Sequence, residues 1–194
     1  RPGSTFARTD AELAKLPGYG LDIESSRKES RKLLSAAGQS NLKITLVNNR
    51  AFTFFGVFVA DQLRQVGVSV EHLPLDTPQV AARRISGDYD LIFDSPAEFI
   101  DDPTIQLAYF EPFSTNRSNL ARVGDPTFVD KYQSQMRDLD IKSRTRKVKD
   151  LEAYLIEKSY VMPLFWQVRK RVVDAQLRGL GDPPTNYLKL DLSD

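Results

Sequence analysis

The order of apolar runs between residues 42 and 103 constrains this chain more than any other feature. Residues 42–47, 68–73 and 91–93 are short and rich in β-branched and large apolar side chains, as strands are. A helix-like segment over residues 54–66 follows the first run, and another leads to the third. This alternation predicts an α/β fold with a central, mainly parallel sheet and helices on both faces.

The composition excludes several classes of chemistry. The chain has 194 residues, of which 41% are hydrophobic and 27% charged, so it can bury a core. A net charge of +1 gives no long-range attraction to nucleic acid, which we do not expect as a partner. The absence of cysteine excludes disulfides and thiolate chemistry but fits a periplasm as well as a cytosol. No apolar run approaches the ~20 residues of a membrane span.

The sequence predicts no catalytic residue, no cofactor and no metal site. His72 is the only histidine, and its apolar neighbours favour a half-exposed structural role. A Ser-His-Asp triad would need His72, and no G-x-S-x-G turn precedes a serine. The basic residues between 142 and 149 alternate with acidic ones, which is typical of a solvated helix face.

The remaining elements follow from breakers and apolar periodicity. We expect an irregular segment over residues 1–24, a helix from Ser25 or Ser26 to Gly38, a polar loop over 111–125, a strand over 161–166 and a polar exit segment over 175–194. Two further helices show one apolar face each. Those faces comprise Phe128, Tyr132, Met136 and Leu139 in the first, and Val148, Leu151 and Leu155, with Tyr154 beside them, in the second.

The candidate ligand-binding residues stand where the predicted strands end. Parallel strands deliver their carboxyl ends to one side of a sheet, where such sheets bind ligands. The candidates are Asn48, Arg50, Asp94, Ser95, Glu98, Phe99, Asp101 and Trp166. Glu98 and Asp101 could face a cationic or hydroxyl-rich ligand, and Trp166 could form a ring wall or a core contact. Asp102 instead suits the cap of a helix that begins at Pro103.

Several motifs, in order, carry a resemblance to a known family. They are "RKESRKLLSAAG" from Arg27, "VADQLRQVGVSVE" from Val59, "GDYDLIF" from Gly87, Asp102-Pro103, the segment 119–130, and Arg146, Glu152, Pro163 and Leu164. Together they resemble the second large lobe of solute-binding protein family 5, the peptide/nickel-type receptors of ABC importers. Each motif is weak alone, but their shared order and spacing cover nearly the whole chain.

The resemblance implies a type II periplasmic-binding-protein lobe. Residues 1–194 would form one lobe of a longer, two-lobed receptor, as a start at Arg1 without methionine also suggests. The receptor would be an exported, periplasmic monomer, with or without a membrane anchor. It would capture a peptide or similar small solute between its lobes and deliver it to the importer's permease subunits. The alternative is a small α/β hydrolytic enzyme using the Asp94, Glu98 and Asp101 carboxylates.

In peptide receptors of the family, an aspartate before the Asp-Pro pair binds the peptide amino group. This chain has Glu98 and Asp101 in that region, and the resemblance does not choose between them. If the solute is cationic, Glu98→Gln or Asp101→Asn in the complete receptor should weaken binding by more than about tenfold, because an unpaired buried charge remains. Asp102→Asn should mainly lower stability. Calorimetric titration of the three variants checks this, and wild-type affinity in all three would contradict it.

Overall fold

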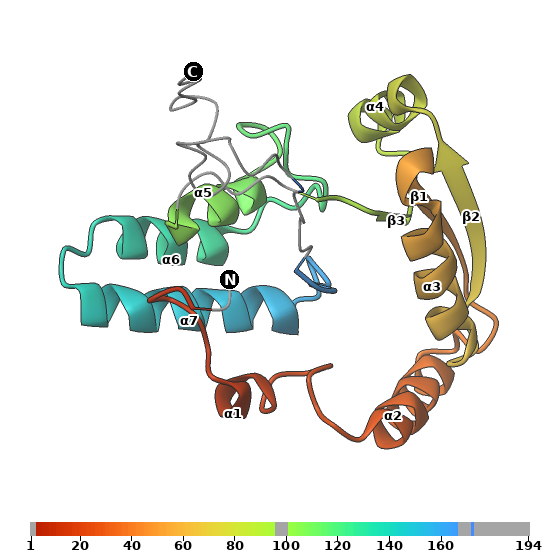
Figure 1. Cartoon of the computed structure of the whole chain (residues 1–194), viewed down its shortest axis with the longest axis horizontal. Coiled ribbons are helices and arrows are strands. Elements are labelled where there is room, and N and C mark those ends of the chain that lie inside the picture. The colour runs from red at the N-terminus through yellow and green to blue at the C-terminus, as the bar shows by residue number, and fades with distance from the viewer. Residues whose placement is uncertain (1–2, 96–100, 167–171, 173–194) are drawn as a thin grey trace.

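The computed structural model describes residues 3–95, 101–166 and 172. Its helices and strands are α1 (Asp10–Leu13), α2 (Ile23–Ala36), β1 (Lys43–Asn49), η1 (Arg50–Phe52), α3 (Thr53–Arg64), β2 (Ser69–Leu75), α4 (Thr77–Ser86), β3 (Leu91–Ile92), α5 (Pro103–Leu107), η2 (Ala108–Phe110), α6 (Pro126–Met136) and α7 (Ile141–Glu157). Figure 1 shows α5, α6 and α7 on one side of the molecule, and the sheet with α2, α3 and α4 on the other. We call these two parts the helical half and the sheet half.

The sheet has three strands in the order β2-β1-β3, and both pairings are parallel. Lys43 pairs with Ser69 at the start of β1, and Leu46 pairs with Leu91 near its end. This confirms the three predicted strands and the α/β class. With right-handed crossovers, the path from β1 to β2 and back across to β3 places α3 and α4 on opposite faces.

The central strand β1 is covered on both faces. Leu46, Val47 and Asn48 are consecutive and all buried, whereas side chains that follow one another along a strand point to opposite faces. Leu46 packs in a hydrophobic cluster with Ala60 of α3 and with Val70 of β2. Two-sided burial explains why the sequence shows a continuous apolar run here.

Helix α2 begins at Ile23, slightly earlier than the predicted start at Ser25 or Ser26. The difference arises because the Asp22 carboxylate caps the helix, accepting a hydrogen bond of 2.9 Å from the Ser25 amide. The helix is followed by Gly38 at φ 69°, the left-handed conformation expected of a glycine after a helix end.

The helical half has a hydrophobic cluster of its own. Its buried members are Leu107, Phe128, Tyr132, Val148, Leu151 and Leu155, with Tyr154 packed against them. The predicted apolar face of α7 is therefore confirmed. At the end of α6, Met136 is 44% exposed, and Leu139 beyond the helix is 98% exposed, so their predicted burial is wrong. Gln135 is buried in their place.

Gln135 can be buried because both ends of its amide are hydrogen-bonded. Its Nε2 donates to Thr104 Oγ1 at 3.2 Å, and its Oε1 accepts from Arg144 Nε at 3.1 Å. A satisfied amide loses little on burial. The helix ends at Met136, which leaves Leu139 beyond the packed face.

Two further predictions need correction. Residues 161–166 form no strand within the described chain, and Trp166 therefore ends no strand. Pro163 has no amide hydrogen to donate to a ladder, and both described pairings of the sheet involve other segments. The segment 1–24, predicted to be irregular, contains α1, whose Thr9 and Glu12 cap each other reciprocally. The predicted exit segment, 175–194, lies outside the described residues.

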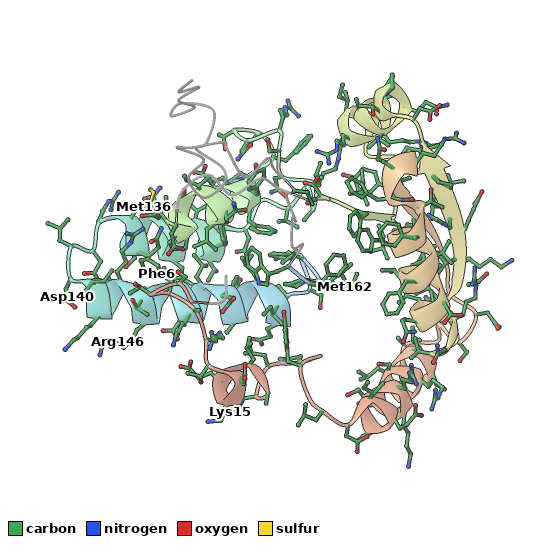
Figure 2. All side chains as sticks on the ribbon, in the orientation of Figure 1. Phe6, Lys15, Met136, Asp140, Arg146 and Met162 are labelled. Carbon is green, nitrogen blue, oxygen red and sulfur yellow. The ribbon has the colours of Figure 1, made fainter. Side chains whose placement is uncertain are left out.

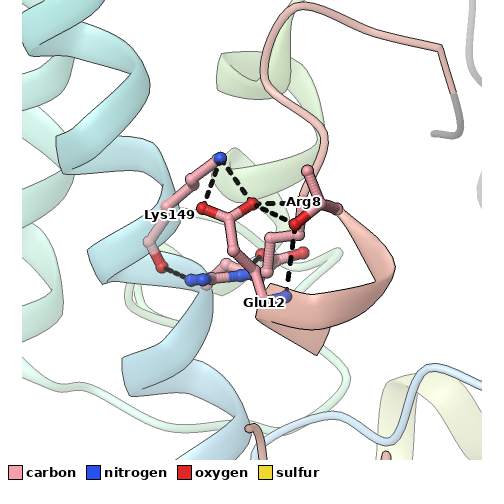
Figure 3. Close-up of polar contacts among 5 residues, drawn as sticks. Arg8, Glu12 and Lys149 are labelled. Carbon is pink, nitrogen blue, oxygen red and sulfur yellow. Dashed lines mark hydrogen bonds and ion pairs between the residues drawn. The ribbon is translucent and has the colours of Figure 1, made fainter. Parts of the chain in front are cut away.

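The N-terminal segment is fastened to α7 by charged side chains (Figure 3). Arg8 Nε contacts Glu152 Oε2 at 2.5 Å, and Lys149 Nζ contacts Glu12 Oε1 at 2.8 Å. The hydrogen bond from Lys149 is the largest cause that lowers the pKa of Glu12 to about 2.

Another residue of the basic run of α7, Lys147, pairs with Asp138 at 2.7 Å. Part of the basic run is thus engaged with other parts of the chain rather than simply solvated.

The predicted polar loop 111–125 joins the two halves. Asn119 is buried and donates to the carbonyl oxygens of Glu111 and Val123, both at 2.9 Å. Arg122 reaches from this loop to the last turn of α4, where Nη2 donates to the carbonyl oxygen of Arg84 at 2.9 Å. Tyr89 Oη also donates to the loop, at 2.8 Å from the Leu120 carbonyl oxygen.

Asp102 caps α5, as the sequence predicts. Its Oδ1 accepts from the Thr104 amide at 2.8 Å and contacts Arg144 Nη2 at 2.7 Å. The hydrogen bond from Arg144 lowers the pKa of Asp102 from its ordinary value of 3.8, while burial opposes that shift. The carboxylate therefore stabilises the fold in its ionised form.

Asp102→Asn should lower the free energy of unfolding by about 1 kcal/mol at neutral pH, because the amide keeps the cap but loses a partly exposed charge pair. A lowered carboxyl pKa stabilises fully above the unfolded value of 3.8 and loses its effect as the pH falls through the folded value. The deficit should therefore shrink in acid. Urea unfolding at several pH values measures it.

Asp140→Asn is the matched control, because Asp140 caps α7 through the Ser143 amide and forms no salt bridge among the described residues. Equal, pH-independent losses in both variants would show that the Arg144 pair contributes nothing.

Candidate functional site

The carboxyl ends of the three parallel strands meet at one edge of the sheet. Asn49 ends β1 and its Nδ2 donates to Thr77 Oγ1, beyond the end of β2, at 2.9 Å. Arg50 Nε contacts Asp76 Oδ1 at 2.9 Å across the same two strand ends. We call the residues that follow the strands, 49–55, 76–77 and 93–95, the strand-end edge. It is the place where sheets of this type bind ligands.

Asn48, a predicted ligand residue, is fully buried beneath this edge. Its Oδ1 lies 2.6 Å from His72 Nε2, and its Nδ2 donates to the Asn49 carbonyl oxygen at 3.2 Å. Because the Asn48 oxygen can only accept, His72 Nε2 carries the proton. In this conformation the Asn48 side chain exposes no atom to a solute, and it holds the end of β1 in place.

His72 has the half-buried structural role that the sequence predicts. Burial is the larger cause that lowers its pKa below the ordinary value of 6.5, and the Arg64 charge is the smaller. A neutral ring suits its hydrogen bond to Asn48. Helix α3 passes directly over the ring, because a Cβ added to Gly56 would overlap the His72 imidazole. Glycine is therefore required for the close approach of α3 to β2.

Among the candidates after β3, Asp94 is already paired. Its Oδ1 contacts Arg84 Nη2 of α4, so the charge of the carboxylate is balanced from within the sheet half. Ser95 follows and is exposed. Glu98 and Phe99 lie outside the described residues. Asp101 resumes the described chain as an exposed residue directly before Asp102.

Arg50 and Trp166 are both open to solvent. The Arg50 side chain is 65% exposed despite its contact with Asp76, and Trp166 is 58% exposed. Phe165, next to Trp166, places its ring centroid 4.5 Å from that of Phe55 on α3. The structure therefore brings residues 165–166 to the strand-end edge from far along the chain.

Sequence reasoning missed the aromatic character of this edge. Phe52, Phe55 and Phe93 form a ring cluster there, with centroid distances of 6.1, 6.0 and 5.4 Å. The available signal was the placement of phenylalanine just after the first strand and at the end of the third. From the sequence we instead expected the nearby carboxylates to form the ligand-binding part of this edge.

Other hollows of the surface lie on the helical half. One of about 610 Å³ is lined by Asp130, Gln133, Ser134, Arg137, Asp138, Leu139 and Lys147. A second, of about 500 Å³, lies beside Asp125 and Tyr154. Neither contains a residue of the strand-end edge, and strand topology rather than depth identifies that edge as the candidate site.

Within the described residues, no group of three or more His, Cys, Asp or Glu side chains could hold a metal ion. None of the described helices combines the length and the apolar character required for a membrane span.

Comparisons with known proteins agree with this architecture. No family model and no curated protein sequence matches the chain. Solved structures do match. The murein tripeptide binding protein MppA of Escherichia coli superposes with a TM-score of 0.65 at 21% identity, over 81% of this chain and 36% of that one.

Two peptide complexes match equally well. Helicobacter pylori DppA in complex with the peptide STSA gives a TM-score of 0.67 at 17% identity, covering 82% of this chain and 31% of that one. Haemophilus influenzae OppA in complex with RPPGFSPFR gives 0.66 at 19%, covering 78% and 31%. This chain has the fold of a periplasmic-binding-protein lobe. It spans about a third of the length of these three structures, and the fold expected from the motif resemblance is confirmed.

Gly56→Ala should destabilise the protein by about 1–3 kcal/mol, because the methyl group displaces His72 and leaves the buried Asn48 oxygen without its donor. Urea unfolding measures the loss. In the double variant with His72→Ala, the losses should be smaller than additive, since the clash disappears with the ring.

Gly124→Ala is the control, since no atom lies within 4 Å of the Cβ that it would add. Strict additivity of Gly56→Ala and His72→Ala would show that the two sites are not coupled.

Proposed function

We propose that this chain is the ligand-binding lobe of an extracytoplasmic solute-binding protein. The complete receptor captures a small solute, a peptide or a similar compound, between two lobes and delivers it to the permease of an ABC importer. The observation that carries the proposal is the open strand-end edge on a lobe whose fold matches three peptide-binding proteins. We also propose that the receptor lies outside the cytoplasmic membrane, that it is a monomer, and that the permease subunits are its partners.

Binding by such a lobe requires a rigid edge. The contacts of Asn49 with Thr77 and of Arg50 with Asp76 hold the ends of β1 and β2 together. The buried Asn48–His72 hydrogen bond fixes β1 beneath them. We therefore assign Asn48 a positioning role and leave direct solute contact to exposed groups, which include Arg50, Ser95 and Trp166.

Closure of the second lobe over this edge would complete the site. A solute that contacts both lobes stabilises the closed arrangement, because those contacts exist only when the lobes are together. Capture and delivery of a solute in this way need no chemical step. MppA and DppA are named as binding proteins.

The hydrolytic alternative finds no comparable support. It needs a carboxyl group free to exchange a proton with a substrate. Among the three carboxylates of that alternative, Asp94 is instead engaged by Arg84, and Glu98 lies outside the described residues. The contact with Arg84 favours a structural role for Asp94.

The 194-residue chain should bind a cognate tripeptide more than about tenfold more weakly than the two-lobed receptor does, because one lobe supplies only part of the enclosing surface. Isothermal titration of both proteins with the same tripeptide measures the difference. A thermal-shift screen of tripeptides, dipeptides, oligosaccharides and amine-bearing solutes first identifies the cognate solute, which takes the place of the tripeptide if it is another compound. Equal affinities would place the site within this lobe alone and contradict capture between lobes.

A further inference from the structure

Five phenylalanine rings meet at the strand-end edge. Phe55 on α3 lies at the centre, with ring centroids at 6.1 Å from Phe52, 3.8 Å from Phe54, 5.4 Å from Phe93 and 4.5 Å from Phe165. The rings come from η1, α3, the end of β3 and the segment after α7. We call these five residues the aromatic wall. Only the tertiary fold assembles it.

The aromatic wall is not part of a core. None of its members belongs to either hydrophobic cluster of the described chain. Phe54 is 62% exposed and Phe165 is 50% exposed, and Trp166 beside them is 58% exposed. Large exposed apolar groups that lie together mark interaction sites, whereas scattered ones need no explanation.

Charged groups of both signs border the aromatic wall. Arg50 precedes Phe52 in η1 and contacts Asp76, while Asp94 follows Phe93 and contacts Arg84. Covering this surface with a dry protein interface would bury these charges, which is costly. A small zwitterionic solute fits better, because its apolar side chain can lie on the rings while its charged ends stay near the rim.

We propose that the aromatic wall is a side-chain subsite that receives an aromatic or large aliphatic side chain of a peptide-like solute. The proposal rests on the function proposed above and adds the class of solute. Aromatic rings that pack edge-to-face or offset attract one another more strongly than the buried apolar area alone explains. We therefore expect a phenylalanine side chain to bind this wall more tightly than other side chains.

The test titrates the 194-residue chain with two tripeptides, Ala-Phe-Ala and Ala-Ser-Ala, which differ only in the central side chain. Calorimetry gives the affinities. The fluorescence of Trp166, the single tryptophan of the sequence, reports binding beside Phe165. Ala-Phe-Ala should bind about tenfold more tightly than Ala-Ser-Ala and should shift the tryptophan emission.

Phe165→Ala should weaken Ala-Phe-Ala binding by about fivefold and leave Ala-Ser-Ala binding unchanged. Phe165 lies outside any helix or strand, so the fold should tolerate its loss. Phe54→Ala is a second variant in the first turn of α3. The matched control is Phe58→Ala, which removes a ring that is 61% exposed on the same helix and makes no ring contact in the described chain.

Three results would overturn the proposal, and they have different consequences for the proposed binding function. Equal affinity for both tripeptides, unchanged by Phe165→Ala and Phe54→Ala, leaves the binding function standing and removes the side-chain subsite. Absence of binding by either tripeptide also removes the side-chain subsite, and titration of the two-lobed receptor with the same tripeptides then decides whether the binding function falls with it. Sedimentation that shows the chain pairing with itself, with Phe165→Ala restoring the monomer, identifies a second copy as the occupant.

Discussion

The two-sided burial of β1 is the constraint on which the rest of the structure depends. Val47 and Asn48 are each completely buried although their side chains point to opposite faces of the sheet. An apolar side chain satisfies that requirement at Val47. At Asn48 a polar one does so, because its amide hydrogen-bonds to His72 and to the Asn49 carbonyl oxygen. Helix α3 passes over His72 beside this pair, and only a glycine at position 56 leaves room for the ring.

The same arrangement positions the candidate site. With β1 held between β2 and β3, Arg50 contacts Asp76 beyond the end of β2, and Phe52 lies beside Phe93 at the end of β3. The polar loop then ties the sheet half to the helical half. Arg122 lies against Gly87, whose positive φ of 80° is rarely adopted by residues with a side chain, and donates to the end of α4. Figure 2 shows Met162 between the two halves, in the same segment after α7 as Phe165.

The charged residues of the helical half illustrate how context decides the role of a pattern. The basic run of α7 alternates with acidic residues, as solvated helices do, yet Arg144 lies against Asp102 and Lys149 against Glu12. Helix periodicity identifies the face on which a residue lies. It does not identify a partner more than a hundred residues away, as Glu12 is from Lys149.

The sequence by itself determined the three parallel strands, the crossover helix α3, the cap at Asp102 and the apolar face of α7, because periodicity and capping are local properties. Tertiary structure decided the rest. Gln135 replaced Met136 in the core because Thr104 and Arg144 satisfy its amide. The apolar pattern of residues 161–166 predicts a strand, but a strand forms only when it hydrogen-bonds to a neighbouring strand. The aromatic wall joins Phe55 to Phe165, and a contact over that separation leaves no periodic trace in the sequence.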